Sequence, residues 1–167
     1  GRIVSQAKQI LKLGEAFIKA SINNSQLSFS MYGDGSEVKK LESIIDNCNN
    51  KHNVKYHGAV SPSEILKVMS THHIFTLMSD YEGMPIALME AMSIGLVPVV
   101  LKGPRGIEEI IDHGVNGFIV ENRDSDYQDK LIYLLENKSI WSEMSENAKF
   151  TILNKYSSAV TNKQWAD

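Results

Sequence analysis

The chain has 167 residues, of which 43% are hydrophobic and 22% are charged. This length fits one domain with a sizeable core, and the composition excludes a mainly disordered chain, which would be poor in apolar residues. Lys and Arg number 17 against 20 Asp and Glu, so the charge balance does not favour a nucleic-acid partner. The single cysteine, Cys48, excludes an internal disulfide and a cysteine-built metal site.

The sequence also lacks the usual marks of export or membrane insertion. No apolar run reaches the roughly 20 residues that span a bilayer, and no signal peptide opens the chain. There is no repeat, low-complexity stretch or flexible linker. We therefore expect one domain over residues 1–167 and a cytoplasmic location.

Apolar runs and helical patterns alternate along the chain. In the first segment Ile10, Leu13 and Phe17 recur at helical spacing and share one face. Ser61 and Pro62 form a helix start, with a cap-type serine before a proline at the first helical position. In chain order we predict helix 6–20, strand 27–32, helix 37–48, strand 54–57, helix 61–70, strand 74–78, helix 85–94, strand 97–101, short helix 106–112, strand 117–120, and helices 126–136, 139–154 and 157–165.

This alternation predicts the fold class. Parallel strands need helix-length connections, and those helices cover both faces of the sheet. The run 74–78 is apolar apart from Thr76, as expected of a strand buried on both faces. We predict a three-layer α/β/α, doubly wound, Rossmann-like domain. Its ligands bind beyond the carboxyl ends of the strands, which here means the loops after Tyr32, His57, Met78, Leu101 and Val120.

The segment 79–92 carries the richest pattern, because it leaves a predicted strand, turns and opens a helix. Pro85 fixes φ in the first helical turn, where its missing N–H has no partner to lose. Free N–H groups near Met84, Ile86 and Ala87 then point out of the helix start, where the helix dipole also favours a phosphate or diphosphate. Gly83 lets the backbone approach such a ligand closely.

Two carboxylates flank this helix start. Glu82 lies at the mouth of the turn, and Glu90 lies about 7.5 Å along the helix from Pro85, at ~1.5 Å per residue. They can accept hydrogen bonds from hydroxyl groups at two points of one extended ligand, such as a sugar and a ribose joined by a diphosphate. Spacing alone leaves a second interpretation open, because acids at a helix start complement the dipole and a Glu inside a helix is usually solvated.

The spacing of these carboxylates also matches a known pattern. Glu82 and Glu90 have seven residues between them, and Ala91-Met92 and Gly95-Leu-Val-Pro98-Val-Val follow. The pattern resembles the E-x7-E signature of retaining glycosyltransferases of the GT4 type (glycosyl transferases group 1). Further motifs match that family in order: Gly1-Arg2 with Lys8, Gly33-Asp34-Gly35, His57-Gly58-Ala59-Val60, Gly106-Ile-Glu-Glu109-Ile-Ile and Gly114-Val-Asn116-Gly117-Phe-Ile-Val.

The resemblance covers nearly the whole chain and implies the carboxyl-terminal, donor-binding half of a GT-B enzyme. It implies that Arg2 and Lys8 neutralise the donor diphosphate, where cations stabilise the charge that develops on the leaving group. It implies that Glu90 holds the ribose hydroxyls and that the loop from Gly58 to Val60 borders the nucleobase. The donor-binding residues that it implies are Arg2, Lys8, Gly33, Gly58, Val60, Gly83, Met84, Pro85, Ile86 and Glu90.

The resemblance also implies a catalytic residue and a reaction. Glu82 matches the carboxylate that contacts the sugar near the reacting carbon, either as a nucleophile or, as we favour, by positioning the donor for a front-face displacement. The implied enzyme is a hexosyltransferase that moves sugar from a nucleotide-diphosphate donor, a UDP-sugar in first place, to a saccharide or lipid-linked acceptor in surface polysaccharide biosynthesis. It implies no metal and no further cofactor.

Two parts of the family pattern are missing from the sequence. The buried strand that precedes the Gly1-Arg2 element is absent or reduced to Ile3-Val4, and because that strand is central in a doubly wound sheet, its absence should cost stability or leave a gap. The amino-terminal, acceptor-binding domain is also absent. We therefore expect the chain alone to be inactive, residues 157–167 to form a helix that packs on the missing half, and any peripheral membrane contact to run through that half.

Two other functions stay open. The first is a non-catalytic nucleotide-sugar-binding subunit that works with a separate acceptor-binding chain. The second is an α/β interaction domain that kept the fold and lost the ligand; intact Glu82, Glu90, Arg2 and Lys8 argue against it.

Three short motifs indicate structure rather than a ligand. Gly33-Asp34-Gly35 lacks the third glycine of the dinucleotide fingerprint, since Val38 stands there, which disfavours an NAD site and favours a tight turn. Asp124-Ser125-Asp126 is predicted to cap the helix at Asp126 rather than to hold a metal. His72-His73 closes a helix, where a helix-end cation explains one of the two.

Overall fold

The computed structural model describes residues 9–48, 53–103 and 106–156. The predicted donor residues Arg2 and Lys8 and the predicted terminal helix 157–165 lie outside these ranges. The described elements are α1 (Ile10–Asn23), β1 (Phe29–Met31), α2 (Val38–Asp46), β2 (Val54–Tyr56), α3 (Ile65–Met69), β3 (Ile74–Leu77), α4 (Ile86–Ser93), β4 (Val97–Leu101), α5 (Ile107–Ile110), β5 (Phe118–Val120), α6 (Ser125–Glu136) and α7 (Lys138–Lys155).

Within the described residues the predicted elements are present, with some ends shifted. The first helix begins at Ile10, because Gln9 has a left-handed backbone with φ 48°. The helix predicted from Ser61 begins only at Ile65. Before it the chain turns, and the N–H groups of Glu64 and Ile65 both donate to the Ser61 carbonyl, at 3.0 and 3.2 Å.

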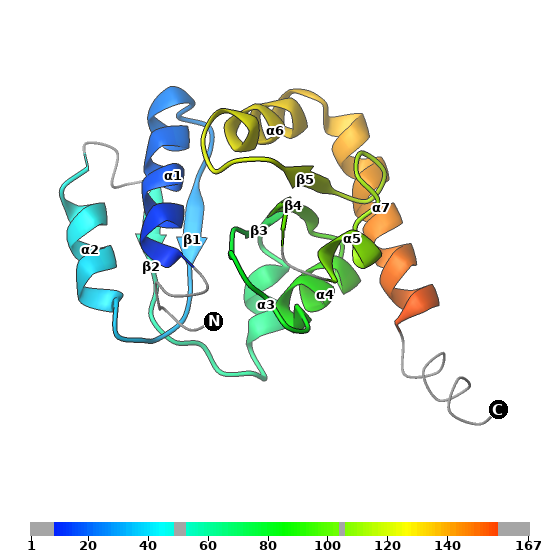
Figure 1. The fold of residues 1–167 in the computed structure, drawn as a ribbon, viewed down its shortest axis with the longest axis horizontal. Coiled ribbons are helices and arrows are strands. Elements are labelled where there is room, and N and C mark those ends of the chain that lie inside the picture. The colour runs from blue at the N-terminus through cyan, green and yellow to red at the C-terminus, as the bar shows by residue number, and fades with distance from the viewer. Residues whose placement is uncertain (1–8, 49–52, 104–105, 157–167) are drawn as a thin grey trace.

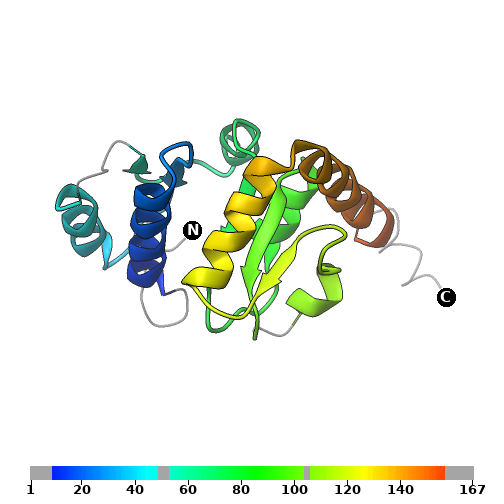
Figure 2. The ribbon, with the colours of Figure 1, turned by 90° about the horizontal axis from the view of Figure 1, so that it is seen from above.

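The strands pair in parallel, as predicted, and helices cover both faces of the β3-β4-β5 sheet. β4 lies between β3 and β5, and β1 pairs with β2. Figure 1 shows α6 on one side of the β3-β4-β5 sheet and α4 and α5 on the other, and Figure 2 shows the same layers from above. The α/β class with layered helices is therefore confirmed.

β4 shows why the layers form. All five of its residues are buried, and they alternate between two apolar clusters, as the two-residue period of a strand requires. Val97, Val99 and Leu101 pack in the cluster that includes α1 and α6, whereas Val100 packs in the cluster of α4, α5 and α7.

β3 differs from the prediction. We expected its apolar run to be buried on both faces, but every residue from Ile74 to Leu77 is only half-buried. The reason is its position: among the described strands β3 pairs with β4 alone, and it pairs with neither β1 nor β2. Among the described residues the sheet is thus divided into a pair and a triplet.

An apolar cavity of about 1130 Å³ occupies this division. Both strand edges line it, with Phe29 and Met31 from β1 and Phe75 and Leu77 from β3. Unpaired strand edges expose backbone groups that ordinarily bind a neighbouring strand. Across the described residues, the two halves of the sheet therefore meet through side chains rather than through a strand ladder.

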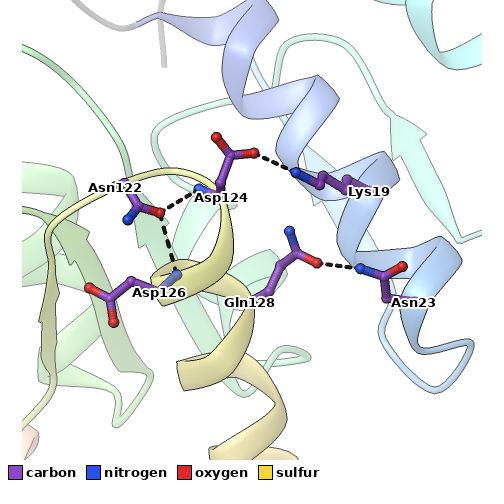
Figure 3. Close-up of polar contacts among 6 residues, drawn as sticks. All are labelled: Lys19, Asn23, Asn122, Asp124, Asp126 and Gln128. Carbon is purple, nitrogen blue, oxygen red and sulfur yellow. Dashed lines mark hydrogen bonds and ion pairs between the residues drawn. The ribbon is translucent and has the colours of Figure 1, made fainter.

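Polar contacts between α1 and the start of α6 join the two halves (Figure 3). The Lys19 ammonium lies 2.7 Å from the Asp124 carboxylate, and the Asn23 amide donates to Gln128 Oε1 at 2.6 Å. Asn122 Oδ1 accepts from the N–H groups of Asp124 and Asp126, at 3.0 and 3.3 Å. Asp124 is the N-cap residue of α6 and Asp126 is the acid of its first turn, as predicted, but Asp124 makes no side-chain capping bond. Asn122 supplies that side-chain cap instead.

Tyr127, at this interface, should make the free energy of unfolding depend on pH. It is fully buried and lies 3.2 Å from the Thr76 hydroxyl, and burial raises the pKa of its phenol well above the usual value. Below pH ~10 the phenol is protonated in both the folded and the unfolded chain. Above it only the unfolded chain releases the proton, so the free energy of unfolding should fall as pH rises, by up to ~1.4 kcal/mol per pH unit.

Urea denaturation between pH 8 and 11 measures this slope. Tyr127→Phe should flatten it, while Tyr133→Phe, at a side chain that is 41% exposed, should leave it as in the wild type. Equal slopes for the two variants would contradict the assignment to Tyr127.

Candidate functional site

The cavity extends from the divided sheet to the start of α4, and it gathers residues from several loops. Three predicted donor residues line it: Val60, Ile86 and Glu90. Tyr32, directly after β1, and Ser79, two residues after β3, line the same cavity. The site thus lies at the carboxyl ends of the strands, where a doubly wound sheet holds its ligands.

The start of α4 is built differently from the prediction. Pro85 is buried and precedes the helix, with φ −81° and ψ 66°, rather than standing in its first turn. The Ile86 N–H, predicted to be free, donates to the Met84 carbonyl at 2.9 Å. The other two amides predicted to be free, those of Met84 and Ala87, have no partner among the described residues, so they remain available to an anionic ligand.

Glu82 is held in place beside the cavity. The Ser79 hydroxyl, on a residue that is 1% exposed, donates to Glu82 Oε1 at 2.6 Å. Because Ser79 is fixed at the end of β3, this bond defines where the Glu82 carboxylate lies. Met84 is 70% exposed, and Gly83 is exposed as well, so the turn after Glu82 faces solvent.

The glycines predicted after β1 and β2 lie together. The Gly33 N–H donates to the Gly58 carbonyl at 2.8 Å, and the Tyr56 hydroxyl donates to the Gly33 carbonyl at 2.6 Å. Asp34 Oδ1 accepts from the Gly35 N–H at 2.7 Å, and the Val38 N–H donates to the Gly35 carbonyl at 3.3 Å, so the chain turns directly after these glycines. These bonds fix the two loops that border the cavity near Val60.

Aromatic and imidazole rings at this end of the cavity were not predicted. The Tyr32 and His57 rings stack at 4.6 Å and 10°, and His72 meets Tyr32 edge-on at 6.3 Å. Burial lowers the pKa of His57, and Lys55 and His72 act in the same direction, so the imidazole is neutral at pH 7. No sequence pattern links Tyr32 with His57, because the two follow different strands, β1 and β2.

The described residues contain no cluster suited to a metal and no membrane span. No group of three or more His, Cys, Asp or Glu side chains among them could hold an ion. His72 Nδ1 lies 3.0 Å from the Val68 carbonyl at the end of α3, as expected of a helix-end imidazole. No helix within the described ranges has both the length and the apolarity needed to cross a bilayer.

Comparison with known sequences identifies a family. The sequence model described as "glycosyl transferases group 1" matches residues 1–150. A poly(ribitol-phosphate) alpha-N-acetylglucosaminyltransferase of Staphylococcus aureus is 27% identical over 158 residues, which are 93% of this chain and 31% of that protein. The amylovoran biosynthesis glycosyltransferase AmsK of Erwinia amylovora is 34% identical over 135 residues, which are 74% of this chain and 33% of that protein.

Solved structures agree with the fold. A mutant of S. aureus TarM, crystallised with fondaparinux, alpha-GlcNAc-glycerol and UDP, superposes with a TM-score of 0.90 at 26% identity, over 99% of this chain and 33% of that one. Anabaena HepE, in complex with UDP and glucose, gives a TM-score of 0.85 at 24% identity, over 98% of this chain and 45% of that one, which shows the fold alone. The chain spans about a third of the length of the relatives that it matches.

Proposed function

Because the chain belongs to the glycosyl transferases group 1 family, we propose that it binds the nucleotide-diphosphate sugar of a retaining glycosyltransferase, with a UDP-sugar as the favoured donor. The observation that carries the proposal is the single cavity that joins Val60, the start of α4 and Glu90, with Glu82 fixed beside it by Ser79. The UDP held by the TarM structure supports the choice of nucleotide.

The site suggests how the donor is held. Glu90 accepts hydrogen bonds from the ribose hydroxyls, and the open amides of Met84 and Ala87 face the diphosphate. Arg2 and Lys8 supply the cations that stabilise charge on the departing nucleotide diphosphate, so no metal is required. Glu82 positions the sugar for front-face displacement with retained anomeric configuration, and the loop from Gly58 to Val60 borders the base.

The whole enzyme needs a further domain for its acceptor. We propose a saccharide or lipid-linked acceptor in surface polysaccharide synthesis, as the amylovoran enzyme among the relatives suggests, and a hexosyl group as the one transferred. This chain alone binds donor without transferring it. The alternative, a donor-binding subunit of a two-chain enzyme, is favoured by one observation: a relative from Streptococcus pneumoniae, 27% identical, is named the GtfA subunit of a peptide N-acetylglucosaminyltransferase.

Calorimetric titration with UDP, GDP and ADP tests the proposal. We expect UDP to bind most tightly, with Kd in the micromolar range or weaker. A folded chain that binds none of the three at millimolar concentration, either alone or within the longer polypeptide, would refute donor binding.

Gly83→Ala tests whether a ligand lies close to this backbone, because the substitution should affect ligand binding without affecting stability. A Cβ at this position meets no atom within 4 Å, and its backbone is not in the left-handed region. We therefore expect the free energy of unfolding to change by less than about 0.5 kcal/mol. If the diphosphate approaches this backbone, the methyl group should weaken UDP binding about threefold to tenfold, within the cost typical of overpacking. Unchanged UDP affinity would place the diphosphate elsewhere.

A further inference from the structure

Arg123 reaches from the loop between β5 and α6 to the end of β3. Its Nε and Nη2 donate to the Met78 carbonyl at 3.1 and 2.8 Å, and Nη2 also pairs with the Asp80 carboxylate. Met78 is 1% exposed, and the Arg123 side chain is 19% exposed. A guanidinium that binds a backbone carbonyl and a carboxylate together fixes both in one geometry.

The loop that carries Arg123 is itself firmly held. Asn122 caps α6, and Asp126 Oδ2 accepts from the Glu121 N–H at 2.7 Å. These contacts lie on either side of Arg123 in the sequence and hold its backbone in place. The guanidinium is therefore a support for the segment after β3 rather than a mobile surface charge.

The segment that Arg123 holds ends at the candidate catalytic carboxylate. Ser79 lies between Met78 and Asp80, the two residues that the guanidinium binds, and its hydroxyl donates to Glu82 at 2.6 Å. The contact with Arg123 lowers the pKa of Asp80, and Gln9 and Lys12 act in the same direction, so Asp80 is ionised at neutral pH. A continuous series of contacts thus runs from Arg123 through residues 78–80 to Glu82.

We propose that Arg123 is a positioning residue, which sets the Glu82 carboxylate for the sugar of the donor by fixing residues 78–80. The inference rests on the proposed donor site. Within that site, Arg123 affects recognition of the sugar and not binding of the nucleotide. Arg123 itself touches no substrate.

Hydrogen exchange of the ligand-free chain tests the first step. Arg123→Gln should raise the exchange rates of the amides of residues 79–83 about tenfold, the change expected when a hydrogen bond to a charged group is lost, and leave those of β4 unchanged. Arg123→Lys keeps the positive charge but loses the guanidinium with its several N–H donors, so it should restore only part of the protection of these amides from exchange. Lys102→Ala is the matched control, because it removes an exposed ion pair to Glu121 in the same loop and should leave residues 79–83 protected.

Binding of UDP-GlcNAc and of UDP tests the second step. Arg123→Gln and Ser79→Ala should each lower affinity for UDP-GlcNAc about fivefold, as for one lost hydrogen bond, with UDP affinity changed less than twofold. Unchanged exchange at residues 79–83, or an equal loss for both ligands, would overturn the inference. A wild-type chain that binds neither ligand would refute the proposed function instead, and the exchange rates alone would then decide whether Arg123 holds the segment.

Discussion

Glu90→Ala is expected to weaken UDP binding by about 1–3 kcal/mol, or about 5- to 150-fold in Kd, because a carboxylate that accepts hydrogen bonds from ribose hydroxyls is lost. Glu90 is half-buried on α4 and lines the cavity, so solvent screens its hydrogen bonds less than those of an exposed acid. Calorimetric titration of the variant with UDP measures the change.

The matched control is Glu143→Ala. Glu143 is an exposed acid within α7, so this variant removes the same charge and gives the same gain in helix propensity without touching the cavity. Its UDP affinity should equal that of the wild type. If Glu90→Ala also binds UDP normally, the ribose lies elsewhere and the E-x7-E resemblance misassigns its second carboxylate here.

Gly117→Ala is expected to destabilise the fold by about 3 kcal/mol, at the upper end for overpacking. A Cβ at Gly117 would lie 2.4 Å from Pro98 Cγ and 2.8 Å from the Pro98 carbonyl oxygen. Pro98 is in β4, the middle strand of the triplet, and Val99 pairs with Phe118, the first residue of β5, so Pro98 lies opposite Gly117 directly before β5. Neither strand can move away without breaking the ladder, so the strain should appear in the midpoint of urea denaturation.

A double mutant identifies the cause of that loss. Pro98→Ala removes the ring atoms at 2.4 and 3.0 Å and leaves the carbonyl contact at 2.8 Å, so the pair of substitutions should cost less than the sum of the two single ones. Gly83→Ala is the control for stability, because a Cβ there meets open space. Strict additivity of the two substitutions would contradict the proposed clash.

The space between the two parts of the sheet connects the interior of the fold with the candidate site. One cavity reaches from the edges of β1 and β3 to Ile86 and Glu90 at the candidate donor site. Contacts such as Asn23 with Gln128 hold the two halves of the sheet across this space. The geometry of the site therefore depends on contacts between α1 and α6 as well as on the strands.

Local pattern determined most of the fold. The alternation of strand-type runs and helical spacing predicted the order of the described elements and their parallel pairing, because side-chain period and connection length are properties of short segments. The same was true of the placement of Glu82 before α4 and of Glu90 within it. The burial of β3 was predicted wrongly, since burial depends on which strands are neighbours and not on composition.

Only the tertiary structure decided how the candidate site is held together. Three contacts join residues that are far apart in the sequence and leave no periodic signal in it. They are the stacking of Tyr32 on His57, the hydrogen bonds from Arg123 to the Met78 carbonyl and the packing of Gly117 against Pro98. The side-chain cap supplied by Asn122 and the ion pair of Asp124 with Lys19 were likewise not predicted. Sequence thus determined which segments form and which residues flank the site, and packing between segments decided which groups remain free to bind.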